Sequence, residues 1–159
     1  MADAVAKRLL DAIKTELSAI TGMQHVWLGA FPIDLGGRAN DTAFPVAAVK
    51  ILSADPEEVS LAGGSPLIYR TNNVALVVLD NGRTESDEDW SSDRAFELEK
   101  LVMAAILADR THGGLSRNTT WTGTTYTPEG DWAQVDTSVA MTFDIITRNK
   151  EADTSAGDP

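Results

Sequence analysis

The chain has 159 residues and no cysteine, which suits one domain and excludes disulfide bonds and thiolate metal sites. Acidic residues outnumber basic ones by 24 to 13, and the net charge of −11 argues against tight binding to phosphates or to anionic membrane surfaces. Such a charge suits a surface that DNA passes without being held, although solubility is the simpler explanation for it. We expect no secretory signal and no membrane span, because the chain opens on an amphipathic pattern and its apolar runs are short.

The N-terminal part of the chain predicts a helix, a short strand and a long loop. Apolar residues recur at spacings of three and four over residues 3–21, which is typical of a helix that buries one face. Residues 24–29 alternate as a strand does. Residues 30–44 contain proline, glycine, asparagine and aspartate, so we expect an irregular loop, and loops of this length in compact domains are usually functional.

Two strands are predicted in the middle of the chain, over residues 46–53 and 67–80. Between them we expect a turn at residues 55–58 and a hairpin tip at Gly63-Gly64, with a short strand before the tip. The segment 74–79 is apolar on both faces, which indicates a central strand that is covered on both sides.

The C-terminal part predicts one helix and two strands. The helix is expected over residues 91–109, directly after the most acidic stretch of the chain, 85–93. The strands, over 118–127 and 132–148, are joined by a four-residue turn and therefore form an antiparallel hairpin. The last strand alternates apolar and polar residues, so one of its faces is buried and the other is wet.

This order of elements predicts an α+β fold with a mainly antiparallel sheet and two helices packed on one face. Residues 1–148 are expected to form a single domain. Residues 149–159 have the composition of a disordered tail, since they are rich in small and polar residues and show no periodicity.

The sequence offers little chemistry for catalysis. His25 and His112 belong to no recognisable catalytic or metal motif. A divalent cation site or an acid-based hydrolase would use Asp87, Glu88 and Asp89, but these contiguous carboxylates lack the alternating spacing and the glycine of a calcium loop. A solvated loop before a helix explains them better. We therefore predict no catalytic residues, no cofactor and no metal.

Surface features remain as the candidate functional elements. Trp132 has the strand parity opposite to Val135 and Phe143, so it faces away from the core. It is either an interface residue or a strand-end residue that packs under a loop. Extended hairpins and sheet edges are means of joining neighbours, so we predict a protein that assembles with other proteins.

Four segments carry a resemblance to a known family. They are the helix over residues 4–20, the strand opening Phe44-Pro45-Val46-Ala47-Ala48-Val49, the helix over 91–109 and the closing strand over 139–148. In the order and hydrophobicity of these elements the chain resembles the tail terminator proteins of long-tailed bacteriophages and of related phage-like particles. These proteins are also called tail completion or head–tail joining proteins. The acidic segment 85–93 is longer than the family pattern leads us to expect.

The resemblance implies a structural protein of the virion tail, made in the cytoplasm of a host bacterium. It implies a homo-oligomeric ring of six subunits that caps the completed tail tube and offers a surface to the head connector or stopper protein. Its partners are then the major tail tube protein and that connector, while DNA passes through without specific binding. We expect Asp87, Glu88 and Asp89 to lie at the lumen, and these residues or Trp132 to lie at an interface.

Three alternatives stay open. The chain is another head–tail connector or a minor tail component, or it is an adaptor that binds a cellular protein through an exposed sheet edge, or it is the hydrolase built on the acid cluster.

Overall fold

The computed structural model describes residues 4–31, 45–59, 67–81, 90–126, 137–150 and 153–157. These residues form two helices and six strands. In chain order they are α1 (Val5–Ser18), β1 (His25–Leu28), β2 (Val46–Val59), β3 (Leu67–Asp80), α2 (Trp90–Leu107), β4 (Asn118–Thr125), β5 (Thr137–Lys150) and β6 (Asp153–Gly157).

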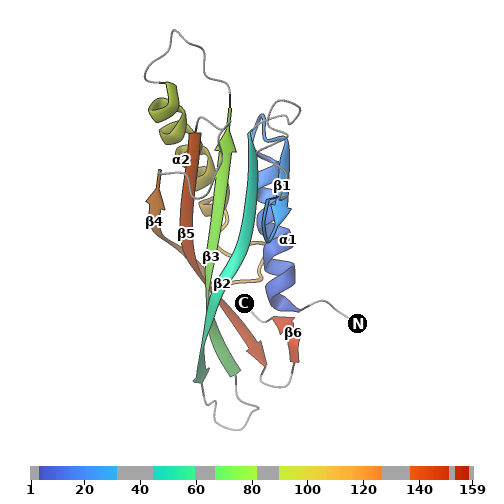
Figure 1. Ribbon diagram of the computed structural model, residues 1–159. Coiled ribbons are helices and arrows are strands. Elements are labelled where there is room, and N and C mark those ends of the chain that lie inside the picture. The colour runs from blue at the N-terminus through green and yellow to red at the C-terminus, as the bar shows by residue number, and fades with distance from the viewer. Residues whose placement is uncertain are drawn as a thin grey trace.

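The strands form one sheet in the order β1-β2-β3-β5-β4, with β6 paired to the end of β5. All neighbouring strands are antiparallel except β1, which runs parallel to β2. The three central strands are each 14 residues long, so the sheet is tall and strongly twisted (Figure 1). The predicted mainly antiparallel α+β fold is confirmed.

Both helices pack on one face of the sheet, behind the strands in Figure 1. The buried face of α1 presents Leu9, Ile13 and Leu17, as the spacing of its apolar residues predicts. These side chains join one core with α2 and with alternate residues of the long strands. On β5 the buried apolar residues are Val139, Met141, Phe143 and Ile145, which confirms the predicted parity of the last strand.

Strand β2 corrects the predicted turn at residues 55–58. The strand continues from Val46 to Val59 and stays paired with β3 throughout, including Pro56 opposite Arg70. Proline is tolerated there because this half of β2 has no strand on its other side among the described residues. A bulge between Ile51 and Ser53 leaves Leu52 as the extra residue, and it bends the strand.

The C-terminal residues also differ from the prediction. Residues 149–159 were expected to form a tail without structure, yet β5 continues through Lys150 and residues Asp153–Gly157 form β6. Strand β6 pairs with the end of β5 and contacts α1, and it lies beside the N-terminal turn of α1 (Figure 1). Pairing with a preformed strand end needs little sequence signal, which explains why composition alone misses it.

Candidate functional site

The predicted site residues Asp87, Glu88, Asp89 and Trp132 lie outside the described residues, as do residues 32–44 of the predicted long loop. The described structure does show which elements come before and after residues 82–89. Strand β3 ends at Asp80, and α2 begins at Trp90.

An ion pair ties these two elements together. The Asp80 side chain is only 8% exposed, and its Oδ2 lies 2.5 Å from Nε of Arg94 in the first turns of α2. Its other oxygen accepts a hydrogen bond of 2.8 Å from the backbone N–H of Asn81. Burial disfavours the charge of Arg94, but the hydrogen bonds and charges of Asp80 and Glu97 outweigh burial and raise the pKa of the guanidinium. The ion pair therefore ties the end of β3 to the start of α2.

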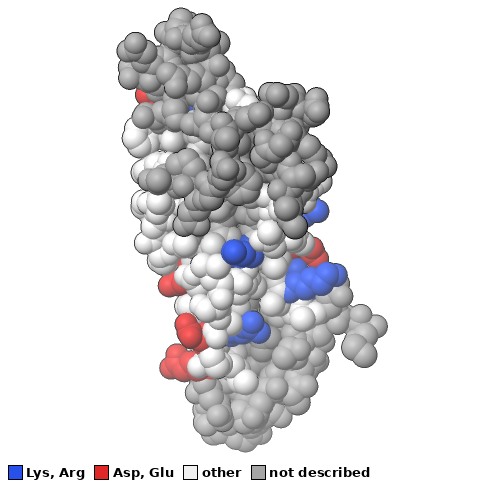
Figure 2. Space-filling view, in the orientation of Figure 1, with Lys and Arg blue, Asp and Glu red and all other residues white. Residues whose placement is uncertain are grey.

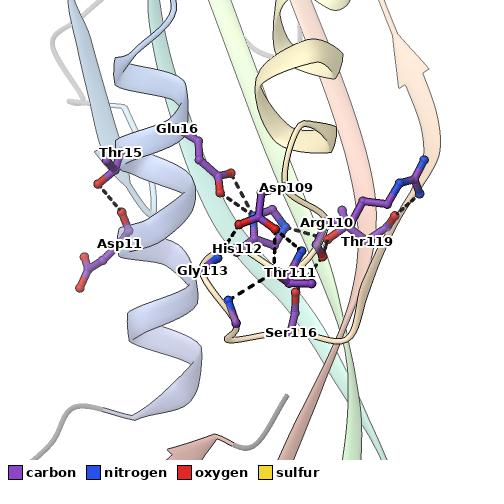
Figure 3. Close-up of polar contacts among 11 residues, drawn as sticks. Asp11, Thr15, Glu16, Asp109, Arg110, Thr111, His112, Gly113, Ser116 and Thr119 are labelled. Carbon is purple, nitrogen blue, oxygen red and sulfur yellow. Dashed lines mark hydrogen bonds and ion pairs between the residues drawn. The ribbon is translucent and has the colours of Figure 1, made fainter.

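The most connected polar cluster surrounds His112, in the turn between α2 and β4 (Figure 3). The imidazole is 1% exposed. Its Nδ1 lies 2.8 Å from a carboxylate oxygen of Glu16 on α1, and its Nε2 lies 2.7 Å from the hydroxyl of Thr119 on β4. The Thr119 hydroxyl donates in turn to the carbonyl of Arg110, at 2.9 Å.

This cluster joins elements that are distant in sequence. Nδ1 of His112 is within hydrogen-bond distance of the Glu16 carboxylate and Nε2 is within hydrogen-bond distance of the Thr119 hydroxyl, with the donor at each bond set by the tautomer of the ring. Both ring nitrogens of His112 are thus occupied, and the ring is shielded from solvent. Sequence reasoning found no motif around His112, whereas the structure shows that it ties α1 to the α2–β4 turn.

Asp109 shapes the turn that holds His112. His112 has a φ of 49°, in the left-handed region that non-glycine residues rarely adopt. The Asp109 carboxylate accepts from the hydroxyl and backbone N–H of Thr111 and from the N–H of Gly113, at 2.6–2.9 Å. These hydrogen bonds, that of the Thr111 side chain first, lower the pKa of Asp109 to about 2. Asp-x-Thr before Gly-Gly is a readable turn signal in the sequence.

We expect the variant Asp109→Asn to unfold at a lower urea concentration than the wild type at pH 7, because an amide accepts these hydrogen bonds more weakly. The folded-state pKa of about 2 lies below the ordinary value of 3.8, so the carboxylate stabilises the fold above pH 3.8 and loses this effect as the pH falls toward 2. The difference between the two urea midpoints should therefore close over that range.

The matched control for this experiment is Asp11→Asn. Asp11 is exposed on α1, and its carboxylate makes no hydrogen bond or ion pair with the rest of the described chain. Its midpoint should equal that of the wild type at both pH values. A gap for Asp109→Asn that persists unchanged at pH 2 would show that the carboxylate charge does not stabilise the turn.

The helix-free face of the sheet turns toward the viewer in Figure 2, where its described part is mostly uncharged, with scattered basic and acidic side chains. Asn73 donates to Asp144 across β3 and β5 at 3.1 Å. Thr122 and Thr142 share a hydrogen bond of 2.7 Å across β4 and β5. Near the far end of the sheet, the guanidinium of Arg117 lies 4.9 Å from the ring centre of Tyr69 and hydrogen-bonds to its hydroxyl. These polar side chains on the helix-free face therefore hydrogen-bond to one another across neighbouring strands.

The outer edge of β4 is the less protected edge of the sheet. No described strand pairs with its outer side, and residues 118–125 contain no charged residue and no proline. Lysine, proline and inward-pointing charges are the features that usually block pairing at an edge. The one irregularity is a bulge between Trp121 and Gly123.

The opposite edge is formed by β1 and then by β2. β1 covers β2 only as far as Val49, where the backbone N–H of Gly29 closes the pairing at 2.8 Å. Beyond that point the outer side of β2 has no described partner. This part of the strand carries Asp55, Pro56, Glu57 and Glu58, which discourage strand pairing. The two edges therefore differ in both length and chemistry.

Within the described ranges, no three histidine, aspartate or glutamate side chains are placed to hold a metal ion. Neither described helix is long and apolar enough to cross a bilayer.

Comparison with known proteins adds no assignment. The chain matches no model of a known protein family, and no curated protein is significantly similar to it.

Proposed function

We propose that this chain is a structural assembly protein of a phage-like particle, in which a ring of six copies caps the completed tail tube and joins it to the head connector. The major tail tube protein and the connector or stopper protein are then its partners, and DNA passes through the ring. This function places the protein at the head–tail junction, after synthesis in the bacterial cytoplasm.

One observation carries this proposal beyond the resemblance in element order: the sheet has two open edges of different composition. The β4 edge lacks charge and proline, whereas the β2 edge carries Pro56 and three acids. Contacts between unlike surfaces repeat from copy to copy, and they close into a ring when the rotation allows it. A symmetric dimer through the β4 edge would leave the acidic β2 edge unused, whereas a ring uses both edges.

Deleting the gene from a genome that encodes such a particle is the direct test. Without the cap we expect tails of unregulated length and filled heads without tails, seen by negative-stain electron microscopy. Expressing the chain in trans should restore joined particles. Normal joined particles after the deletion would overturn the proposed function.

The acidic segment can be tested in the same complementation. If Asp87, Glu88 and Asp89 line the lumen, replacing all three with serine should leave joined particles intact but impair genome ejection, because DNA then meets a less repulsive wall. The matched control replaces the exposed acids Asp11 of α1 and Glu97 of α2, which lie outside the acidic segment 85–93. Normal ejection by the triple variant would contradict the lumen assignment.

A second candidate function is favoured by the unprotected β4 edge. An adaptor would use that edge to accept an extended segment of a cellular protein, through backbone hydrogen bonds along Asn118–Thr125. In that case the purified chain stays monomeric at every concentration, and the deleted gene leaves particle assembly unchanged.

A further inference from the structure

A hollow of about 360 Å³ lies on the helix-free face of the sheet, at the end where β3 begins. Side chains from β2, β3, β5 and the start of β4 line it, and they are Glu57, Tyr69, Thr71, Arg117, Asn118 and Ile146. A volume of this size is large enough to hold a small molecule.

The strand register fixes the floor of the hollow. Ile146 of β5 lies opposite Thr71 of β3 on one side and opposite Asn118 of β4 on the other. One apolar side chain is therefore flanked by a hydroxyl and an amide, and neither of these polar groups hydrogen-bonds within the described chain. Thr71 and Asn118 are two strand steps apart, which is about 10 Å.

Two opposite charges reach the hollow from opposite sides. On the β4 side, the guanidinium of Arg117 lies 4.9 Å from the ring centre of Tyr69 and hydrogen-bonds to its hydroxyl, which leaves most of its N–H donors unused. On the β2 side, Glu57 lies opposite Tyr69. Neither Arg117 nor Glu57 forms an ion pair with the described chain, although both line the same hollow.

The charges next to the hollow follow the same division. Asp55 of β2, opposite Thr71, adds a second acid on the β2 side. Arg148 of β5, opposite Tyr69, adds a second base toward β4. Asp144, also on this face of β5, hydrogen-bonds across to β3 and lies outside the lining. An anion would be repelled by the acids and a cation by the bases, so a ligand that carries both charges fits best.

From this arrangement we infer that the hollow binds a zwitterionic small molecule, an α-amino acid with an aliphatic side chain. Its carboxylate contacts Arg117 and Asn118, its ammonium contacts Glu57 and Thr71, and its side chain packs on Ile146. The two charged groups of an α-amino acid lie about 3 Å apart, and a hydrogen bond of about 2.8 Å at each end gives a span of about 9 Å. This span matches the spacing of the floor. The inference does not depend on the proposed ring.

Isothermal titration calorimetry of the full chain with L-valine tests the site. We expect one molecule per chain with a Kd below about 1 mM. Two analogues separate the charges, because 3-methylbutanoate lacks the ammonium group and isobutylamine lacks the carboxylate. Each leaves one charge of the hollow without its partner, so each should bind at least about tenfold more weakly than L-valine.

Two variants assign the contacts. Arg117→Gln and Glu57→Gln change exposed positions, so their circular dichroism spectra should equal that of the wild type. Each should weaken binding of L-valine at least about tenfold, because each removes one of the two charge-assisted contacts. The matched control is Lys50→Gln, which removes an exposed charge on the same face outside this hollow and should bind L-valine as the wild type does.

Reversing one charge gives the sharpest result. In Glu57→Lys both sides of the hollow are basic, so 3-methylbutanoate should bind more tightly than L-valine. The inference is overturned if L-valine shows no binding up to about 10 mM, or if either analogue binds the wild type as tightly as L-valine does. Binding of L-valine that survives both glutamine variants unchanged would place it elsewhere on the chain and would equally overturn the assignment.

Discussion

Replacing Leu76 with alanine is expected to lower the free energy of unfolding by about 3–5 kcal/mol. Leu76 lies in the central strand β3, opposite Val49 on one side and Met141 on the other, and it is 1% exposed. Its truncation removes apolar contacts and leaves a cavity that the flanking strands cannot close. A domain of this size has a total stability of about 5–15 kcal/mol, so urea denaturation should show a large shift in midpoint.

Leu52→Ala is the matched control, because it makes the same chemical change at a side chain that is 54% exposed. We expect its effect on unfolding of the monomer to stay within about 0.5 kcal/mol. Equal losses of stability for the two variants would show that Leu52 is part of the core.

Hydrophobic periodicity predicted much of this fold. The spacing of Leu9, Ile13 and Leu17 predicted α1, and the alternation along residues 139–145 predicted which face of β5 is buried. The segment 74–79, apolar on both faces, was expected to be a central strand that is covered on both sides. β3 does lie between β2 and β5, but both described helices cover the same one of its faces. These signals work because burying one face dominates the energy of each element.

The errors occur where pairing with a neighbour overrides local propensity. Residues 55–58 read as a turn because Asp-Pro favours one, yet β3 supplies a full partner for this half of β2. Likewise, residues 153–157 have weak strand propensity, and only the exposed end of β5 makes them β6. A single sequence contains no record of which segments become neighbours.

The same limit applies to the candidate site. The bond between Glu16 and His112 joins residues 96 positions apart, and no local pattern announces it. The general expectation that sheet edges serve assembly came from the predicted hairpins, but the contrast between the two edges depends on strand order and on two bulges. Edge composition becomes informative only when it is known which strands are edges.

Removing Arg94 is the second change expected to have a large effect. In Arg94→Leu the Asp80 carboxylate, 8% exposed, loses its cationic partner and keeps only the N–H of Asn81. Breaking a buried pair from one side leaves a charge in a poorly solvated place, which costs about 3 kcal/mol or more. The exposed Lys100→Leu on the same helix is the matched control, with a change within about 0.5 kcal/mol in urea denaturation.

Repeating Arg94→Leu in an Asp80→Asn background separates the cost of the unpaired Asp80 charge from the cost of lost packing. There the buried charge is already gone, so removing the guanidinium should cost less than about 1 kcal/mol, and the coupling between the two sites should exceed about 2 kcal/mol. Additive losses would mean that Arg94 contributes through its aliphatic stem. Strong coupling would mean that the Asp80–Arg94 ion pair itself joins the end of β3 to the start of α2.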